Sequence, residues 1–208
     1  MGQVGVVASI MLGPLLGGAI NWVGFYGRTG LARRTRGLLA ASVCLGLIAS
    51  ALMHATLGLS HLTLACGLAA TAAAGAALGD AVDGLISDVQ SATVFLAGVA
   101  AIPTIHEPYA WLTGLGGAAL TGAILVSVRS GFKALKGHDG LGAGDIGLAS
   151  ACGAWAGLWY IGPALLASVV ITVAFSTMNR SRADPKLAFG PGLVIGFAAA
   201  FAFSLAER

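Results

Sequence analysis

Long apolar segments, separated by short clusters of charged or helix-breaking residues, run through the whole chain. Each is roughly 20 residues long, the length that an α-helix needs to cross the hydrocarbon core of a bilayer. The alternation of apolar and polar residues typical of transmembrane β-strands is absent from them. The second and third segments are separated only by the short turn from His54 to His61. The pattern predicts eight membrane-spanning helices, at residues 4–25, 37–57, 59–79, 89–105, 109–130, 144–160, 162–178 and 187–205.

The composition agrees with a membrane protein. Of the 208 residues, 57% are hydrophobic and 9% are charged, and the mean hydropathy is +0.90. A soluble domain has about 25% charged residues, so this chain has too little polar surface to cover a globule in water. The 32 glycines favour close helix packing in lipid. We therefore expect an all-α, polytopic transmembrane bundle that forms one domain over residues 1–208, with a short basic loop at 26–36 in place of a soluble domain.

The basic residues predict the orientation of the bundle. With the N-terminus outside, all eleven Lys and Arg residues except Arg208 lie in cytoplasmic segments or, for Arg129, at the membrane edge. This is the positive-inside pattern, so the net charge of +3 reports orientation and does not imply a nucleic-acid partner. No basic region precedes the first apolar segment, so we expect it to be a retained span and not a cleaved signal peptide. The predicted cytoplasmic segments are 26–36, 80–88, 131–143 and 179–186.

One predicted cytoplasmic segment, 80–88, contains Asp80, Asp83 and Asp88 but no Lys or Arg. In this topology Asp80 closes the third span and Asp145 opens the sixth. Two carboxylates from distant parts of the sequence therefore lie at the same face of the membrane. A charged side chain at a membrane boundary is energetically costly, which is typical of a functional residue.

Two aspartates a few Å apart share one proton, because both cannot easily be ionised. The ionised one can take a proton from water while the protonated one polarises a carbonyl group, which is peptide hydrolysis without a metal or cofactor. Gly142 and Gly144 would let a substrate backbone approach Asp145 closely. Each aspartate also has an ordinary interpretation by itself: Asp145 as a helix N-cap, and Asp80 as a water-exposed helix end. The three cysteines are scattered singly, so no metal site is predicted.

Four stretches resemble the type IV prepilin peptidases. Gly142-Ala-Gly144-Asp145, followed by Gly-Ala-Trp at 153–155, resembles the GxGD segment of that family. Residues 80–88, Asp-Ala-Val-Asp-Gly-Leu-Ile-Ser-Asp, look like its first aspartate segment. The Phe-Gly-Pro stretch at 189–191 is similar to one in the family's last span, and Gly-Gly-Ala-Ile-Asn at 17–21 resembles one in its first span.

The resemblance implies an aspartyl protease of the inner (plasma) membrane that removes the basic leader peptide of prepilins or pseudopilins on the cytoplasmic side. Asp80 and Asp145 match the two catalytic positions, and Asp83 is the second candidate for the first of them. The implied partners are the substrate and the lipid bilayer, with no cofactor, metal or nucleic acid. The remaining matched positions are expected to bind substrate or shape loops: Gly142, Gly144, Asp83, Asp88, Asn21, Phe189, Gly190 and Pro191.

Three departures from the family pattern leave other functions open. Ser87 replaces a proline, which should make the loop less rigid, and Gly147 replaces a lysine two residues after the second aspartate. The family's cytoplasmic domain with paired CxxC motifs is absent between the first two spans, so methyl transfer is not implied. The alternatives are a small proton- or cation-coupled transporter and a catalytically inactive scaffold of the same family.

Overall fold

The computed structural model describes residues 3–26, 32–58, 60–105, 109–178 and 188–207. Within these residues the regular secondary structure is entirely helical, which confirms the predicted fold class. The elements are α1 (Gln3–Tyr26), α2 (Ala32–Leu57), α3 (Ser60–Asp83), α4 (Asp88–Ile105), α5 (Ala110–Lys136), α6 (Ala143–Ala156), the short 3-10 helix η1 (Leu158–Tyr160), α7 (Ile161–Met178) and α8 (Gly190–Ala206).

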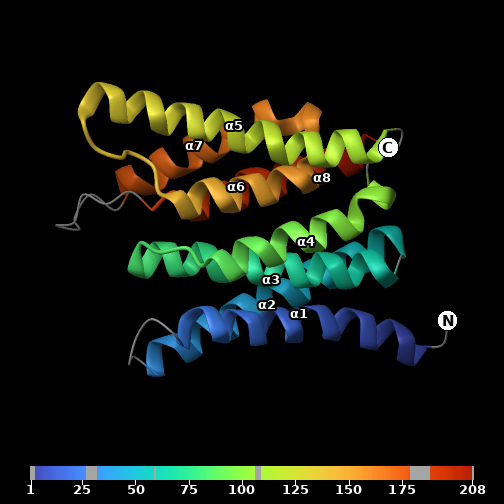
Figure 1. The fold of residues 1–208 in the computed structure, drawn as a ribbon. Coiled ribbons are helices and arrows are strands. Elements are labelled where there is room, and N and C mark those ends of the chain that lie inside the picture. Colours follow the sequence, from blue (N-terminus) through green and yellow to red (C-terminus); the bar gives the residue numbers. More distant parts are fainter. Residues whose placement is uncertain (1–2, 27–31, 59, 106–108, 179–187, 208) are drawn as a thin grey trace.

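The α-helices run side by side in one bundle, with α1 to α4 forming one half and α5 to α8 the other (Figure 1). Helix α3 packs against α1, α2, α4 and α8, and α6 packs against α4, α5 and α8. The contacts of α4 with α6 and of α3 with α8 therefore join the halves. Both chain ends lie at the same end of the bundle (Figure 1), as an even number of passes requires.

Five of the described helices are long and apolar enough to cross a membrane: α2, α3, α4, α5, and α7 together with η1. The helices differ in how deeply they are buried. In the most apolar 18-residue stretch of α3, 72% is buried inside the bundle, whereas 22% is buried in the corresponding stretches of α2 and of α7 with η1. Large apolar side chains such as Leu45 on α2 and Leu166 on α7 are exposed on the outside of the bundle. This arrangement, with α3 in the interior and apolar side chains facing outward, is that of a multi-pass membrane protein.

Small residues allow the helices to pack closely. A Cβ atom added to Gly153 of α6 would lie 2.7 Å from the carbonyl oxygen of Gly117 in α5 and 2.6 Å from Oγ1 of Thr121. Such a side chain would force the two helices apart. Helix association in lipid depends on this close backbone approach, because burial of apolar surface provides little driving force there.

Several helix ends differ from the predicted span ends. Helix α3 continues through Asp80 to Asp83, so the loop before α4 comprises only residues 84–87. Helix α5 extends to Lys136, and α2 begins at Ala32, inside the predicted basic loop 26–36. Hydropathy identifies only the apolar part of a helix, and charged residues continue these helices beyond it. Residues 27–31 and the predicted cytoplasmic segment 179–186 lie outside the described residues.

The predicted sixth span, 144–160, is divided into two elements. Helix α6 ends at Ala156 because Gly157 adopts φ 75°, and η1 follows. A left-handed backbone conformation at this position suits glycine, which has no Cβ atom. Helix α6 is therefore shorter than the neighbouring helices.

Candidate active site

Asp80 lies in the last turn of α3 and is 9% exposed. Its Oδ2 atom accepts a hydrogen bond of 2.7 Å from the backbone N–H of Gly190, the first residue of α8. The N-terminus of a helix has unpaired N–H groups and a partial positive charge. The start of α8 therefore stabilises negative charge on Asp80, 110 residues earlier in the chain.

The Phe-Gly-Pro stretch explains how α8 can approach Asp80. A Cβ atom on Gly190 would lie 2.9 Å from Oδ2 and 3.2 Å from Cγ of Asp80, so any other residue would collide with the carboxylate. Pro191 lies in the first turn of α8, where a missing N–H removes no helical hydrogen bond. Phe189 precedes the helix and packs, partly buried, against the apolar core. These three residues position the helix end that binds Asp80.

Asp145 is the third residue of α6 and is half-buried. Its Oδ2 atom accepts a hydrogen bond of 3.2 Å from the backbone N–H of Gly142, the residue that precedes the helix. Gly142 has no side chain to return a bond, so this is one half of a capping box. The other oxygen, Oδ1, is buried and has no hydrogen-bond partner among the described residues. Buried polar atoms are rarely unpaired, so this oxygen is a candidate for contact with substrate or water.

The loop 84–87 connects the surroundings of the two aspartates. It begins at Gly84, which has φ 65° and donates its N–H to the carbonyl oxygen of Asp80 at 2.9 Å. Its third residue, Ile86, packs on Gly144, where an added Cβ atom would lie 2.9 Å from Cβ of Ile86. The loop that follows Asp80 therefore contacts the residue before Asp145.

The other predicted site residues lie at different distances from this pair. Asp83 and Asp88 are exposed on either side of the loop, as the last residue of α3 and the first of α4. Gly147 is exposed on α6, and a Cβ atom there would be 3.8 Å from Ser91, an ordinary contact. Asn21 makes no described hydrogen bond to either aspartate. It is fully buried and donates to the Ser42 hydroxyl at 3.0 Å and the Thr71 carbonyl at 2.7 Å.

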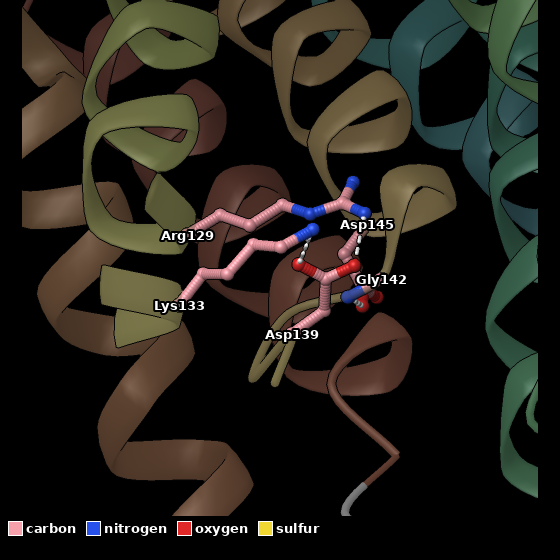
Figure 2. A network of polar contacts seen from close by, with 5 residues as sticks. All are labelled: Arg129, Lys133, Asp139, Gly142 and Asp145. Atoms are coloured by element: carbon pink, nitrogen blue, oxygen red, sulfur yellow. Dashed lines mark hydrogen bonds and ion pairs between the residues drawn. The ribbon is translucent and has the colours of Figure 1, made fainter. Parts of the chain in front are cut away.

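The segment that leads into α6 is held against α5. Asp139 forms ion pairs with Arg129 at 2.8 Å and Lys133 at 3.4 Å, both reaching from α5 beside Gly142 and Asp145 (Figure 2). The hydrogen bond from Arg129 and the two nearby cations hold the pKa of the Asp139 carboxyl below its usual range. The His138 ring also lies edge-on to Phe132 of α5, with 5.4 Å between centroids. These contacts position the glycine-rich turn before Asp145.

Sequence reasoning missed two contributions to this site. It treated Lys133 only as a topology charge, although Arg129 and Lys133 are four residues apart and so share one face of α5. It also missed Gln90, a buried amide in the first turn of α4 that contacts the loop 84–87. The available signal was a glutamine at the start of an apolar span, where an uncharged polar side chain needs a hydrogen-bond partner.

The described residues contain no group of three or more His, Cys, Asp or Glu side chains placed to hold a metal ion. The metal-free mechanism remains a prediction.

The fold and the position of the two aspartates define a class: a multi-pass helical membrane protein with acidic side chains from two helices on either side of one short loop. Residues 68–177, just over half of the chain, match the type IV leader peptidase family, and the chain belongs to that family. The matched range includes Asp80 and Asp145. Asn21 and the Phe-Gly-Pro stretch lie outside it.

The chain is also similar to a protein whose name places it among the leader peptidases. The prepilin leader peptidase/N-methyltransferase of Xanthomonas campestris pv. campestris is 39% identical over 84 residues. The alignment covers 38% of this chain and 29% of the relative's length. No solved structure matches the chain.

Proposed function

We propose that this protein is an aspartyl endopeptidase that cleaves the leader peptide of prepilins or pseudopilins at the cytoplasmic face of the inner (plasma) membrane. Membership of the type IV leader peptidase family supports the reaction and the substrate class. The observation that carries the proposal is that the loop following Asp80 packs on Gly144, next to Asp145, so that aspartates from α3 and α6 lie on either side of one short loop.

The surroundings of the two carboxyl groups favour different roles for them. Asp80 accepts the Gly190 N–H at the start of α8, which favours its ionised form. Asp145 has one buried oxygen without a described partner, which suits a protonated carboxyl able to donate to substrate. Asp80 is thus the general base and Asp145 the general acid.

The reaction follows from these roles. Asp80 accepts a proton from water as the water oxygen bonds to the carbonyl carbon, and Asp145 donates its proton to the carbonyl oxygen. The resulting gem-diol then breaks its C–N bond: Asp145 takes back a hydroxyl proton, and Asp80 gives its proton to the leaving nitrogen. Both residues return to their starting states, so no cofactor is consumed.

The glycines and exposed acidic residues around the pair suit an extended, basic substrate. Gly142 is exposed and has no side chain, so a substrate backbone can pass close to Asp145, whereas the space beside Gly144 is filled by Ile86. The exposed Asp83 and Asp88 complement the positive charge of a basic leader.

The test is cleavage of a co-expressed prepilin panel by wild type, Asp80→Asn, Asp145→Asn and Asp83→Asn, read by mass spectrometry of the pilin N-terminus. Removing a general acid or base lowers rates by about 10²- to 10⁴-fold. We expect this loss for the variants at 80 and 145, with wild-type amounts of enzyme in the membrane. Asp83→Asn distinguishes the two candidates for the first catalytic position, because it removes an acid three residues from Asp80: it should weaken binding of the basic leader, seen as a higher KM, without this loss in rate.

Other results would redirect the assignment. Cleavage that persists in Asp145→Asn would exclude the acid/base pair. Absence of cleavage in the wild type, with pilus or secretion output unchanged by Asp145→Asn, would instead indicate an inactive scaffold. Solute uptake into proteoliposomes that depends on Asp80 would indicate a transporter. The same mass spectra report whether the new N-terminus is methylated.

A further inference from the structure

A chain of buried amides connects the interior of the bundle to the loop 84–87. Gln90, in the first turn of α4, is 1% exposed. Its Oε1 atom accepts the Ser87 backbone N–H at 3.3 Å, and its Nε2 atom donates to Oδ1 of Asn21 at 2.9 Å. Asn21 in turn donates to the Ser42 hydroxyl and to the Thr71 carbonyl. These contacts connect α1, α2, α3 and α4 with the loop.

The groups at the two ends of this hydrogen-bonded network determine which amide atoms donate and which accept. The Thr71 carbonyl can only accept a hydrogen bond, so Asn21 must present its NH₂ group there and its oxygen to Gln90. Gln90 must then donate to Asn21 and accept from Ser87, whose backbone N–H can only donate. A carbon side chain at position 90 would leave both partners unpaired in a buried place.

The loop at the end of this chain lies between the two aspartates. Gly84 donates to the Asp80 carbonyl, and Ile86 packs on Gly144, next to Asp145. A shift of the loop would therefore change the position of the start of α6 relative to the end of α3. Ser87 occupies the position where the family pattern has proline, which has no N–H to donate to Gln90.

We propose that Gln90 is a positioning residue that sets the separation of the Asp80 and Asp145 carboxylates through the loop 84–87. This inference rests on the proposed proteolysis for its functional meaning. Displacing reacting groups by about 1 Å costs about 10²-fold in rate. Gln90→Leu should therefore lower kcat for prepilin cleavage by about 10- to 100-fold and leave KM nearly unchanged.

The matched control is Ser42→Ala. Ser42 is fully buried and accepts a hydrogen bond from the same Asn21 amide, but at the end of the hydrogen-bonded network that is farther from the loop. Both variants lose a buried hydrogen bond, so both should lower the thermal unfolding temperature. Only Gln90→Leu should lower kcat. Equal loss of thermal stability with wild-type kcat in both variants would show that Gln90 is merely structural and overturn the inference.

Gln90→Glu provides a readout that a purely structural role would not move. An ionised glutamate can still accept the Ser87 N–H but cannot donate to Asn21, whereas a protonated glutamate can do both. The kcat of Gln90→Glu relative to wild type should therefore rise as pH falls. A ratio that does not change with pH would contradict the amide chain.

Hydrogen exchange separates this inference from the proposed function. In Gln90→Leu, amide exchange should increase both at 84–87 and at 140–147, and in Ser42→Ala at neither segment. Faster exchange confined to 84–87 would overturn the inference, whatever the enzyme cleaves. If Asp145→Asn cleaves as well as wild type but exchange at the two segments remains coupled, the proposed function fails and the structural coupling stands.

Discussion

The missing Cβ atom at position 190 determines how closely α8 can approach Asp80. An added Cβ would lie 2.9 to 3.2 Å from three atoms of the Asp80 side chain. These distances are shorter than ordinary van der Waals contact, so either the carboxylate or the helix end must move. Either movement would break the hydrogen bond from the Gly190 N–H to Asp80.

We therefore expect Gly190→Ala to impair cleavage by displacing Asp80, with a loss in kcat/KM of about 10²-fold for a displacement near 1 Å. Prepilin cleavage by enzyme in detergent measures it. Gly162→Ala is the control, because no atom lies within 4 Å of a Cβ added to Gly162 in α7. If Gly190→Ala cleaves as fast as Gly162→Ala, the contact with α8 does not position Asp80.

At the scale of helices, close packing of α7 and α8 determines where the N-terminus of α8 lies. Cβ atoms added to Gly192 or Gly196 would lie 2.6 Å from backbone atoms of Ser168 in α7. The glycines are four residues apart, so they lie on one face of α8 and form a seam against α7. A side chain in this seam would separate the helices and move the helix end that binds Asp80.

Gly196→Leu should therefore lower the free energy of unfolding by about 1–3 kcal/mol or more, the usual cost of overpacking, and should lower cleavage as well. Thermal unfolding in detergent and a cleavage assay measure the two effects. The matched control is Ala199→Leu, which adds the same side chain at an exposed position of α8. A Gly196→Leu protein as stable as Ala199→Leu would show that the seam does not hold α8.

For the whole molecule, the bundle has two chemically different ends. The end of α3, the end of α5 and the start of α6 lie toward one end of the bundle, and the two chain ends lie at the other (Figure 1). These helix ends contain Asp80, Lys133 with Lys136, and Asp145. Basic residues mark the cytoplasmic side of membrane proteins. The aspartate pair should therefore face the cytoplasm and the chain ends the outside.

Reporter fusions test this orientation. Alkaline phosphatase fused after Glu207 should be active, because it folds only outside the cytoplasm, and green fluorescent protein at the same site should be dark. A reporter fused after Gly137, in the loop before α6, should show the opposite pattern. Fluorescence from the C-terminal fusion would show that the orientation is the opposite one. The aspartates would then lie on the side of the membrane away from the cytoplasmic leader peptide.

The sequence alone determined the helical membrane class, the approximate positions of the eight helices and the family. Helix length and apolar character are local properties, so they can be read from consecutive residues. The sequence also predicted that Asp80 and Asp145 share one face, because their order relative to the spans sets their depth. The ends of α3 and α5 were less predictable, since a helix can continue past the apolar residues that mark its span.

Only the tertiary structure decided what surrounds each aspartate. Asp80 is bound by the start of α8, which is distant in sequence. The Asn21 amide is hydrogen-bonded to Gln90, which in turn binds the loop 84–87, and it makes no described hydrogen bond to the aspartates. Such contacts join helices that are far apart in the chain, and no periodicity in the sequence reports which helix faces meet. The glycines are the clearest example: their number was visible in the sequence, but the atoms that they allow to approach became apparent only when the helices were packed together.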